Sequence, residues 1–564
     1  MSQGRGRIAF VLVAVVSDER GGGVLQPLDA AGRRAGPAQP VTDLAAAVAA
    51  REAAQRPRWV WASGASVYPA LLRAGVRVER CHDVELTEAL LLGHAGRWGE
   101  PRSFAAAWAR LTGSAVPPDP PPRPAEPPGH GQGALFEALP GPPGPGVDAL
   151  TRVHADQLAR IAATAHPGRF RLLVAAESAG ALIAVEMGAA GLPWRVDVHD
   201  EILAELLGEP SPVGGPPRRL AELAAGIADA FGVRQLHADS PAELLRAFAR
   251  AGVELPNTRA WVLREVDHPA VPLVLEYKEL YRIWTAHGWA WRDAWVRDGR
   301  FQPEYVPGGV VSGRWATRGG GALQIPKVIR RAVVADPGWR FVVADAGQLE
   351  PRVLAAVSGD ARLAAAGGAG DLYAALARDA FGGDRPRAKV ALLGAMYGQT
   401  GGAAVPALAV LKHHYPTAFG YVEAAARTGE TGGLVRSWLG RTCPPGSAGF
   451  GDVDVDAAGD PQSPRARAAR SRGRFTRNFV IQATAAEWAS TLLATLRGQL
   501  AGTEAELVFF QHDEVIVHCP ADQADAVAEA VTRCGERSAA LLFGDTPVRF
   551  PLDLSVVDCY ADAA

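Results

Sequence analysis

The sequence predicts a multi-domain protein of mixed α/β and α+β class, and three observations support that prediction. A chain of 564 residues is long enough for about four domains. Its 48% hydrophobic and 21% charged content excludes a wholly disordered or collagen-like protein. Short apolar runs alternate with helical stretches, and a proline-rich segment separates the first 115 residues from the rest.

The N-terminal region, residues 1–115, is predicted to be a small α/β domain. Residues 8–16 form an apolar run behind two arginines, which a signal peptide would also show. Ser17-Asp18-Glu19-Arg20 follows in place of a small-residue cleavage site, so we favour a buried first strand. Residues 59–61 and 76–78 are predicted to be strands, and residues 86–92 a helix.

Residues 116–146 are predicted to be a linker, because twelve of the 29 residues from 117 to 145 are proline. Such a segment cannot form a packed core and stays extended. From residue 147 onward the composition is globular again, and helical periodicity dominates residues 176–283. Within that stretch Ser240 is placed to cap a helix that opens at Pro241.

Two acidic residues follow apolar runs in the second part of the chain. Residues 341–344 predict a strand that ends at Asp345. Residues 507–510 and 515–517 predict a hairpin whose bend contains Asp513. An isolated aspartate in such a place is more often a turn residue or a helix cap. Other motifs of the sequence are therefore needed to interpret these two.

A helix with a cationic end and an apolar end is predicted between Asp384 and Gly398. Asp384 can cap its start, and Gly398 can end it. The residues that recur at every fourth position, and so share one face, are Arg385, Lys389, Leu393 and Tyr397. An arginine and lysine stripe is often only a solvated face, but this stripe continues into apolar side chains. It therefore suits a nucleoside triphosphate, with the phosphates on the cations and the base on the apolar end.

The charge distribution permits a nucleic-acid partner although the net charge is only −2. Residues 381–480 contain 13 Lys and Arg against 7 Asp and Glu, and this local excess fits a surface that faces DNA. A second ladder of Arg474, Asn478 and Gln482 offers donors for phosphates and base edges. Only four of the 58 basic residues are lysine, which GC-rich coding explains.

Cysteine usage and hydropathy indicate the cellular setting. The five cysteines form no C-x-x-C pair, so neither a zinc ribbon nor a disulfide framework is indicated and a reducing compartment fits best. No run reaches the ~18 apolar residues of a membrane span. We therefore expect a cytoplasmic, nucleoid-associated protein without a membrane partner, and most simply a monomer.

From about Leu172 to the C-terminus the chain resembles family A DNA polymerases, the DNA polymerase I type. The segments that carry the resemblance occur in the family's order: Ser312-Gly313-Arg314 with Leu323-Gln324-Ile325-Pro326, residues 345–352 as motif A, residues 385–398 as motif B, residues 474–486 as the palm helix, and His512-Asp513-Glu514 as motif C. Upstream, Glu186-Met187, Asp239-Ser240-Pro241 and residues 275–278 resemble thumb landmarks.

The resemblance implies a fold and a domain plan. An RNase H-like, exonuclease-type N-terminal domain at 1–115 and the linker at 116–146 would precede a right-hand polymerase at 147–564. Its thumb would span about 170–300, its palm about 301–370 and 478–564, and its fingers about 371–477. We expect no 5′-nuclease domain before the first of these.

By the same resemblance, Asp345 and Asp513 would bind two Mg²⁺ ions, helped by the Ala346 carbonyl, and Glu514 would support them. Phosphoryl transfer needs charge neutralisation and in-line positioning, and two ions ~3.5–4 Å apart supply both. Lys389 would protonate the leaving group, because an ammonium is a better proton donor than a guanidinium.

The remaining implied roles concern the substrates. Glu350 would be the steric gate against a ribose 2′-hydroxyl, and Tyr397 would stack by the templating pair. The residues implied for nucleotide binding are Arg385, Lys389, Leu393, Tyr397, Glu350 and Gln348. The residues implied for contact with primer-template DNA are Arg314, Gln324, Arg474, Asn478, Gln482 and His512.

Several positions depart from the family pattern. Ala346 and Gly347 stand where tyrosine and serine are usual, and Leu393 replaces a phenylalanine or tyrosine that stacks on the deoxyribose. Residues 447–472 look like an insertion with a D-x-D-x-D run, which reads as a solvated loop because the glycine and glutamate of a calcium loop are missing.

The N-terminal region resembles a 3′-5′ exonuclease domain only weakly. Such a nuclease needs four carboxylates around two metals, and the first strand lacks the Asp-x-Glu pair. Val67 stands near the expected second aspartate, while His82-Asp83 and residues 153–156 resemble later landmarks. We therefore expect an exonuclease-like fold without activity; the alternative is an unrelated α/β domain.

The linker contains Gln132, Leu135 and Phe136, which resemble the Q-x-x-L-F peptide by which bacterial polymerases dock on the sliding clamp. An extended segment with two adjacent apolar anchors can bind in this way, but the same pair can also pack back on a domain.

The sequence thus predicts a template-directed DNA polymerase, a nucleotidyltransferase that adds deoxynucleotides to a primer 3′ end in replication or repair synthesis, with proofreading lost. The alternative is a degenerate polymerase that binds primer-template DNA without efficient synthesis, which Ala346, Gly347 and Leu393 would favour. A nuclease is disfavoured because the N-terminal carboxylates are missing.

Overall fold

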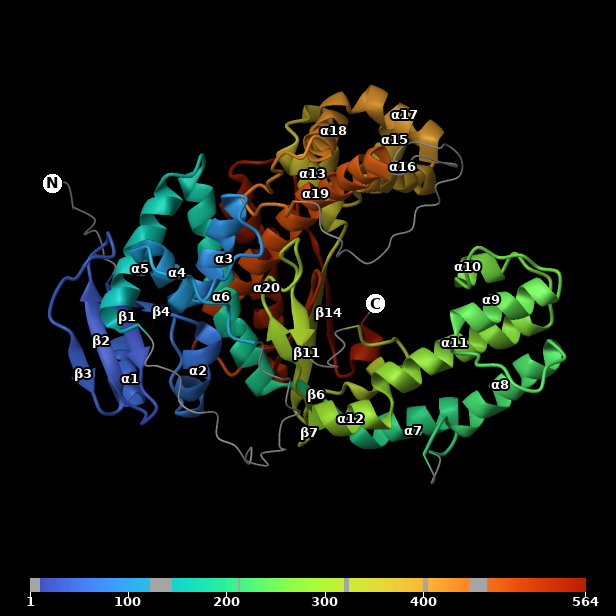
Figure 1. Cartoon of the computed structure of the whole chain (residues 1–564), viewed down its shortest axis with the longest axis horizontal. Coiled ribbons are helices and arrows are strands. Elements are labelled where there is room, and N and C mark those ends of the chain that lie inside the picture. The colour runs from blue at the N-terminus through green and yellow to red at the C-terminus, as the bar shows by residue number, and fades with distance from the viewer. Residues whose placement is uncertain are drawn as a thin grey trace.

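The computed structural model describes residues 11–121, 145–210, 214–318, 324–398, 404–445 and 464–563. An N-terminal domain lies at one end of the molecule, and a long helical arm lies at the other (Figure 1). Between them a four-stranded sheet is surrounded by helices, and a helical lobe rises above it (Figure 1).

The N-terminal domain is built on a mixed five-stranded sheet of order β3-β2-β1-β4-β5. The strands are β1 (Leu12–Ser17), β2 (Gly23–Leu28), β3 (Gln39–Val41), β4 (Arg58–Trp61) and β5 (Arg80–Asp83). The helices are α1 (Leu44–Gln55), α2 (Gly64–Arg73), α3 (Val84–His94), α4 (Phe104–Thr112) and α5 (Val147–Ala162). Helix α5 falls in the range predicted for the polymerase, 147–564, but its Leu150 and Val153 share an apolar cluster with Leu12 and Val60, so it packs with the N-terminal sheet. Alternate β1 side chains enter two apolar clusters, Val13 and Val15 on one face and Leu12 and Ala14 on the other, as the two-residue period of a strand requires.

One predicted strand of this domain is wrong. Residues 76–78 are an extended connection, and the neighbouring strand begins only at Arg80. The side chains of Val76 and Val78 are nevertheless buried in the domain core. Alternating burial in a loop gives the same sequence pattern as a strand, and only the hydrogen bonds to a neighbour distinguish the two.

Helix α6 (Pro167–Ala190) runs through the centre of the molecule and is apolar along most of its length. By length and composition alone it could cross a membrane, but 67% of its most apolar window is buried inside the protein. It packs against α2 and β5 on one side and against β12 and α19 on the other. Because it is covered on several sides, a helix of this kind needs no polar face.

The helical arm, residues 192–301, contains α7 (Val196–Leu207), α8 (Arg218–Ala230), α9 (Pro241–Arg250), α10 (Ala260–Leu263), α11 (Ala270–His287) and α12 (Trp289–Trp295). Three short strands close its base: β6 (Leu192–Pro193), β7 (Val296–Arg297) and β8 (Arg300–Phe301). As predicted, Ser240 caps α9 by accepting a hydrogen bond from the Glu243 amide. The arm projects away from the central sheet (Figure 1).

The central sheet has the order β12-β13-β11-β14 and all its neighbours are antiparallel. Its strands are β11 (Trp339–Ala346), β12 (Glu506–Gln511), β13 (Glu514–Pro520) and β14 (Leu552–Val557). Phe341 and Val343 enter the cluster shared with the arm, whereas Val342 and Ala344 enter the cluster under α19 and α20 (Ala524–Phe543). Both faces are covered, which explains why residues 341–344 are continuously apolar.

The upper lobe consists of α14 (Ala361–Gly367), α15 (Leu372–Ala380), α16 (Arg385–Tyr397), α17 (Ala404–His414) and α18 (Pro416–Glu430). Helix α13 (Leu349–Val357) leads into it directly from β11, and the long α19 (Pro464–Gln499) runs from it to the central sheet. A small hairpin of β9 (Glu304–Val306) and β10 (Ala316–Arg318) lies between the arm and the sheet in the chain. Three short 3-10 turns complete the fold: η1 (Ile329–Ala332), η2 (Ala521–Gln523) and η3 (Tyr560–Asp562).

A buried charge network fixes the N-terminal domain to the rest of the protein. The Glu186 carboxylate of α6 accepts hydrogen bonds from Arg497 of α19 at 2.7 and 2.8 Å and from the Tyr68 hydroxyl of α2. The Arg497 guanidinium also donates to the carbonyls of Val78 and Glu79. One arginine thus connects three elements that are far apart in the sequence.

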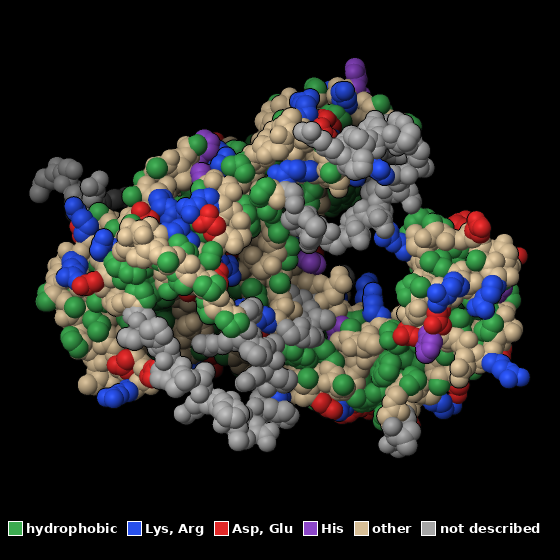
Figure 2. Space-filling model, viewed as in Figure 1, with side chains coloured by type: hydrophobic (Ala, Val, Ile, Leu, Met, Phe, Trp, Pro, Cys, Tyr) green, Lys and Arg blue, Asp and Glu red, His purple; other side chains and the backbone are tan. Residues whose placement is uncertain are grey.

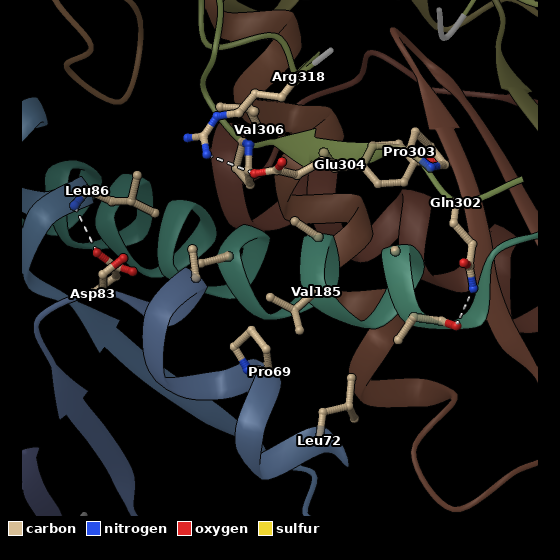
Figure 3. Close-up of a pocket in the computed structure, with 18 of the residues that line it drawn as sticks. Pro69, Leu72, Asp83, Leu86, Val185, Gln302, Pro303, Glu304, Val306 and Arg318 are labelled. Atoms are coloured by element: carbon tan, nitrogen blue, oxygen red, sulfur yellow. Dashed lines mark hydrogen bonds and ion pairs between the residues drawn. The ribbon is translucent and has the colours of Figure 1, made fainter. Parts of the chain in front are cut away.

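A cavity of about 580 Å³ lies at the same junction and is shown in Figure 3. It is lined by side chains of α2, α6 and β9, with Asp83 near one end and Gln302 near the other (Figure 3). None of the residues predicted for catalysis lines this cavity.

Candidate active site

Two strands bring Asp345 and Asp513 together. Asp345 is the penultimate residue of β11, and Asp513 lies in the bend between β12 and β13. In the ladder between β11 and β13, Asp345 is opposite Glu514, and the Ala346 amide donates to the Asp513 carbonyl at 3.1 Å. Motif A and motif C, which are far apart in the sequence, therefore meet at one end of one sheet.

The electrostatics of this pair fit a divalent cation. Burial and then the charge of Asp345 raise the pKa of Asp513 to about 6. Burial, followed by Glu514 and Asp553, raises the pKa of Asp345 as well. Carboxylates that disfavour each other's ionised forms are stabilised by a cation placed between them.

Two carboxylates and one backbone carbonyl could hold a divalent cation that takes its remaining ligands from substrate and water. Among the residues that the structure describes, no three His, Cys, Asp or Glu side chains form a group suited to hold a metal ion. Mg²⁺ is commonly held by one or two carboxylates together with substrate phosphates and water. Asp345 and Asp513, with the neighbouring Ala346 carbonyl, meet that requirement.

Three further side chains next to the pair, Tyr560, Arg330 and Asp553, were not predicted. Tyr560 of η3 is fully buried, and its hydroxyl donates a hydrogen bond to the Glu514 carboxylate. The Arg330 guanidinium lies 4.1 Å from the centre of the Tyr560 ring and opposes the rise in the pKa of Asp345. Asp553 of β14 is opposite Asp345 in the ladder on the other side of β11. The sequence offers no signal for them, because their roles depend on the pairing of β11 with β13 and β14.

Glu350 connects two other predicted site residues, Arg314 and Tyr397. Arg314 donates to one of its carboxylate oxygens at 2.6 Å, and the Tyr397 hydroxyl donates to the other at 2.6 Å. The Glu350 side chain is only 12% exposed. Burial and the Glu350 charge raise the pKa of Tyr397, so this hydroxyl keeps its proton. Two donors therefore fix the carboxylate in one position.

Helix α16 begins and ends where the sequence predicts. The Asp384 side chain accepts from the Arg387 amide at 2.9 Å, and Gly398 closes the helix with a φ of +68°. Arg385 and Lys389 are exposed on it, whereas Leu393 packs against the core of the upper lobe. The cationic end of the stripe is thus accessible and the middle is apolar.

Gln348 faces the upper lobe from the turn between β11 and α13. It has a φ of +58°, which is uncommon for a residue other than glycine. Its side-chain amide donates to Asp371 at 3.0 Å, and its carbonyl oxygen accepts from the Leu372 amide at 2.9 Å. Arg385 pairs with the other oxygen of Asp371 at 2.7 Å.

The residues predicted for DNA contact lie on several different segments of the described chain. His512, with a φ of +57°, lies close enough to Arg314 that burial and then the arginine charge lower the pKa of its imidazole. Arg474, Asn478 and Gln482 are partly exposed on α19, and Gln324 is exposed in the loop before η1. In the described part of the chain no hydrogen-bond donor reaches the buried Oδ1 of Asn478. A wide hollow separates the arm from the upper lobe, with basic side chains at its margins (Figure 2).

The N-terminal landmarks have structural roles here. Burial raises the pKa of Asp83 to about 7, and its carboxylate accepts from the Gly64 and Leu86 amides at 2.6 and 2.9 Å, so it caps α3. Asp156 pairs with Arg160 at 3.3 Å. Gln132, Leu135 and Phe136 lie outside the described residues, as do residues 447–463 of the predicted insertion.

Comparisons with known proteins agree with the predicted family. The model of DNA polymerase family A matches residues 217–558. DNA polymerase I of Chloroflexus aurantiacus is 30% identical over 300 residues, covering 48% of this chain and 30% of the relative. The thermostable DNA polymerase I of Thermus filiformis is 28% identical over 310 residues, covering 51% of this chain and 36% of the relative. The chain thus spans about a third of the length of these relatives.

A solved structure shares the fold along nearly the whole chain. It is described as the POL domain of Pol1 from M. smegmatis in complex with DNA primer-template and dNTP. The TM-score is 0.68 at 17% identity, covering 98% of this chain and 96% of that one. With a family model that matches more than half of its residues, the chain belongs to DNA polymerase family A.

Proposed function

We propose that this protein is a template-directed DNA polymerase that extends a primer 3′ end by two-metal phosphoryl transfer. The observation that supports this most is the convergence of Asp345 and Asp513 at one end of the central sheet, within a chain of this family. Deoxynucleoside triphosphates and primer-template DNA are its proposed substrates, in replication or repair synthesis.

Five residues of the chain would have distinct roles in the reaction. Asp345 and Asp513 would hold two Mg²⁺ ions, which when bound activate the primer hydroxyl and neutralise the triphosphate. Arg385 and Lys389 would receive the phosphates at the exposed end of α16. Lys389 would donate a proton to the departing pyrophosphate, and Glu350 would close the site beside the sugar.

Primer extension tests this proposal directly. We expect wild-type protein with Mg²⁺ and deoxynucleotides to extend a primer, and Asp513→Ala to lose at least about a thousandfold of the rate, because one metal would lack its main ligand. Asp522→Ala is the matched control, since Asp522 is an acidic residue of η2, just beyond the far end of β13. A wild-type protein that binds primer-template DNA without extending it would reject the proposal.

That outcome would favour the alternative, a degenerate polymerase that binds DNA without efficient synthesis. Leu393 motivates it, because an aliphatic side chain packed into the lobe cannot stack on a deoxyribose as a ring does. Leu393→Phe then gives a second measurement: a large gain in extension rate by this variant would indicate that the leucine limits synthesis.

We also propose that the N-terminal domain has an RNase H-like, exonuclease-type fold without nuclease activity. Two features of its sheet support this fold: the strand order β3-β2-β1-β4-β5, and the antiparallel pairing of β2 with both of its neighbours, β1 and β3. β1 has no acidic residue, and Asp83 and Asp156 are engaged in a helix cap and an ion pair. Release of nucleotides from a 3′-labelled single strand, in a Mg²⁺-dependent manner, would contradict this proposal.

Binding of a sliding clamp through Gln132, Leu135 and Phe136 remains a separate prediction, as do a monomeric state and a nucleoid-associated, cytoplasmic location. Deletion of Leu135 and Phe136 should weaken binding to a bacterial clamp by at least about tenfold, because apolar anchors dominate such peptide contacts. Unchanged clamp affinity would end that prediction.

A further inference from the structure

The cationic end of α16 is already paired with a carboxylate from a neighbouring segment. The Nε of Arg385 lies 2.7 Å from Asp371 Oδ2, in the residue that precedes α15. The guanidinium is 49% and the carboxylate 37% exposed, so both groups face solvent in part. A phosphate oxygen would bind the same guanidinium with similar geometry, because carboxylate and phosphate both accept from its planar fork.

Two further hydrogen bonds hold the Asp371 carboxylate in this position, and a third holds its partner Gln348. The other oxygen of Asp371 accepts from the Gln348 side chain at 3.0 Å and caps α15 through the Ala374 amide at 3.1 Å. Gln348 in turn accepts from the Leu372 amide at 2.9 Å. Gln348 and Arg385 are both predicted to bind the nucleotide. Gln348 thus orients the Asp371 carboxylate, which in turn pairs with Arg385.

The ring of Tyr373 lies beside both cations of α16. Its centre is 5.6 Å from the Arg385 guanidinium carbon and 6.0 Å from Lys389 Nζ, within the range of a cation–π contact. The ring itself is buried, with 6% exposure. The segment 371–373 therefore supplies one carboxylate and one aromatic wall to the place where the triphosphate would lie.

We propose that Asp371 is an internal competitor of the nucleotide: it occupies Arg385 in the free protein, and the incoming triphosphate must displace it. The inference rests on the proposed polymerase function. Asp371 would weaken the binding of all four nucleotides equally, because the pair involves the phosphate end and not the base. It would also disfavour retention of the pyrophosphate product, since the carboxylate returns to Arg385.

Asp371→Asn tests the competition and preserves the fold, because asparagine caps a helix as well as aspartate does. We expect KM for deoxynucleotides and the inhibition constant of inorganic tripolyphosphate to fall together by about two- to fivefold, the range that an exposed ion pair can supply. Inhibition by pyrophosphate should strengthen by a similar factor.

Asp379→Asn is the matched control, because Asp379 also pairs with an arginine of the lobe, Arg362, at 2.9 Å. Asp379→Asn should leave unchanged both KM for deoxynucleotides and the inhibition constant of tripolyphosphate. In an Arg385→Gln background the effect of Asp371→Asn should disappear, which a merely structural role of Asp371 would not cause. Unchanged or weaker tripolyphosphate binding by Asp371→Asn would overturn the inference. Absence of extension by the wild type would instead reject the proposed function, since tripolyphosphate binding can be measured without synthesis.

Discussion

At the scale of single residues, Glu350 combines the clearest geometry with a specific expectation. Its carboxylate is held by Arg314 and Tyr397 from two different elements. Glu350→Ala should increase ribonucleotide incorporation by at least about tenfold relative to deoxynucleotide incorporation, because the bulk beside the sugar is lost. Tyr397→Phe keeps the ring and removes only one hydrogen bond to Glu350, so it should give a smaller increase in ribonucleotide incorporation. Unchanged ribonucleotide use by Glu350→Ala would show that the gate is another residue.

Asp513 leads to a prediction about pH. Burial and the charge of Asp345 raise the pKa of the Asp513 carboxyl from the usual value of 3.8 to about 6, so the folded protein binds a proton more tightly than the unfolded chain. The stability of the metal-free protein should therefore fall as pH rises through about 4 to 6. Asp513→Asn should be more stable than the wild type at pH 8 by about 1–2 kcal/mol, allowing for partial exposure.

The stability difference should vanish below about pH 4 and shrink when Mg²⁺ binds the wild type. Denaturant titrations of both proteins at pH 4 and pH 8, without and with Mg²⁺, measure it. Asp336→Asn is the control of opposite sign, because hydrogen bonds from Arg300 lower the pKa of Asp336. An Asp513→Asn variant that is less stable at pH 8 would contradict the electrostatic interpretation.

At the scale of elements, α16 shows how a helix boundary positions a site. Gly398 has a φ of +68°, and a side chain there would lie 3.1 Å from Arg474 Cγ. Gly398→Ala should destabilise the protein by about 1 kcal/mol or more, because alanine is strained at this φ. Gly420→Ala within α18 meets no atom within 4 Å and should instead be neutral or stabilising. Thermal unfolding of the two variants measures the difference. Equal shifts in Tm would contradict the interpretation that the positive φ of Gly398 requires glycine.

The same helix shows what could and could not be predicted from sequence. The four-residue period of Arg385, Lys389, Leu393 and Tyr397, with a cap and a terminal glycine, predicts α16 to the residue. The partners of these side chains were not predictable, because Asp371 looks like any other helix cap. Likewise, Val76 and Val78 alternate as a strand would, although among the described residues no strand pairs with them. Local patterns specify elements, whereas pair contacts depend on how distant elements pack.

At the scale of the whole molecule, Arg497 of α19 attaches the N-terminal domain to the rest of the protein. Arg497 is only 12% exposed and pairs with Glu186, which is 8% exposed. Arg497→Met should cost about 3–5 kcal/mol of unfolding free energy, because a buried carboxylate loses its main partner. Arg533→Met removes an exposed pair with Glu529 and should cost less than about 0.5 kcal/mol. A small effect of Arg497→Met would mean that the domain is only loosely attached.

The order of the central sheet also determines when during synthesis the active site can form. β11 lies between β13 and β14, which are the last two strands of the chain. While the ribosome is still making the upper lobe, β11 has no hydrogen-bonding neighbour on either side and exposes two strand edges. Such edges are templates for aggregation. Chains that stop before residue 552 would therefore leave the Asp345 strand with an open edge, and residues 552–557 are needed to close the sheet that holds Asp345.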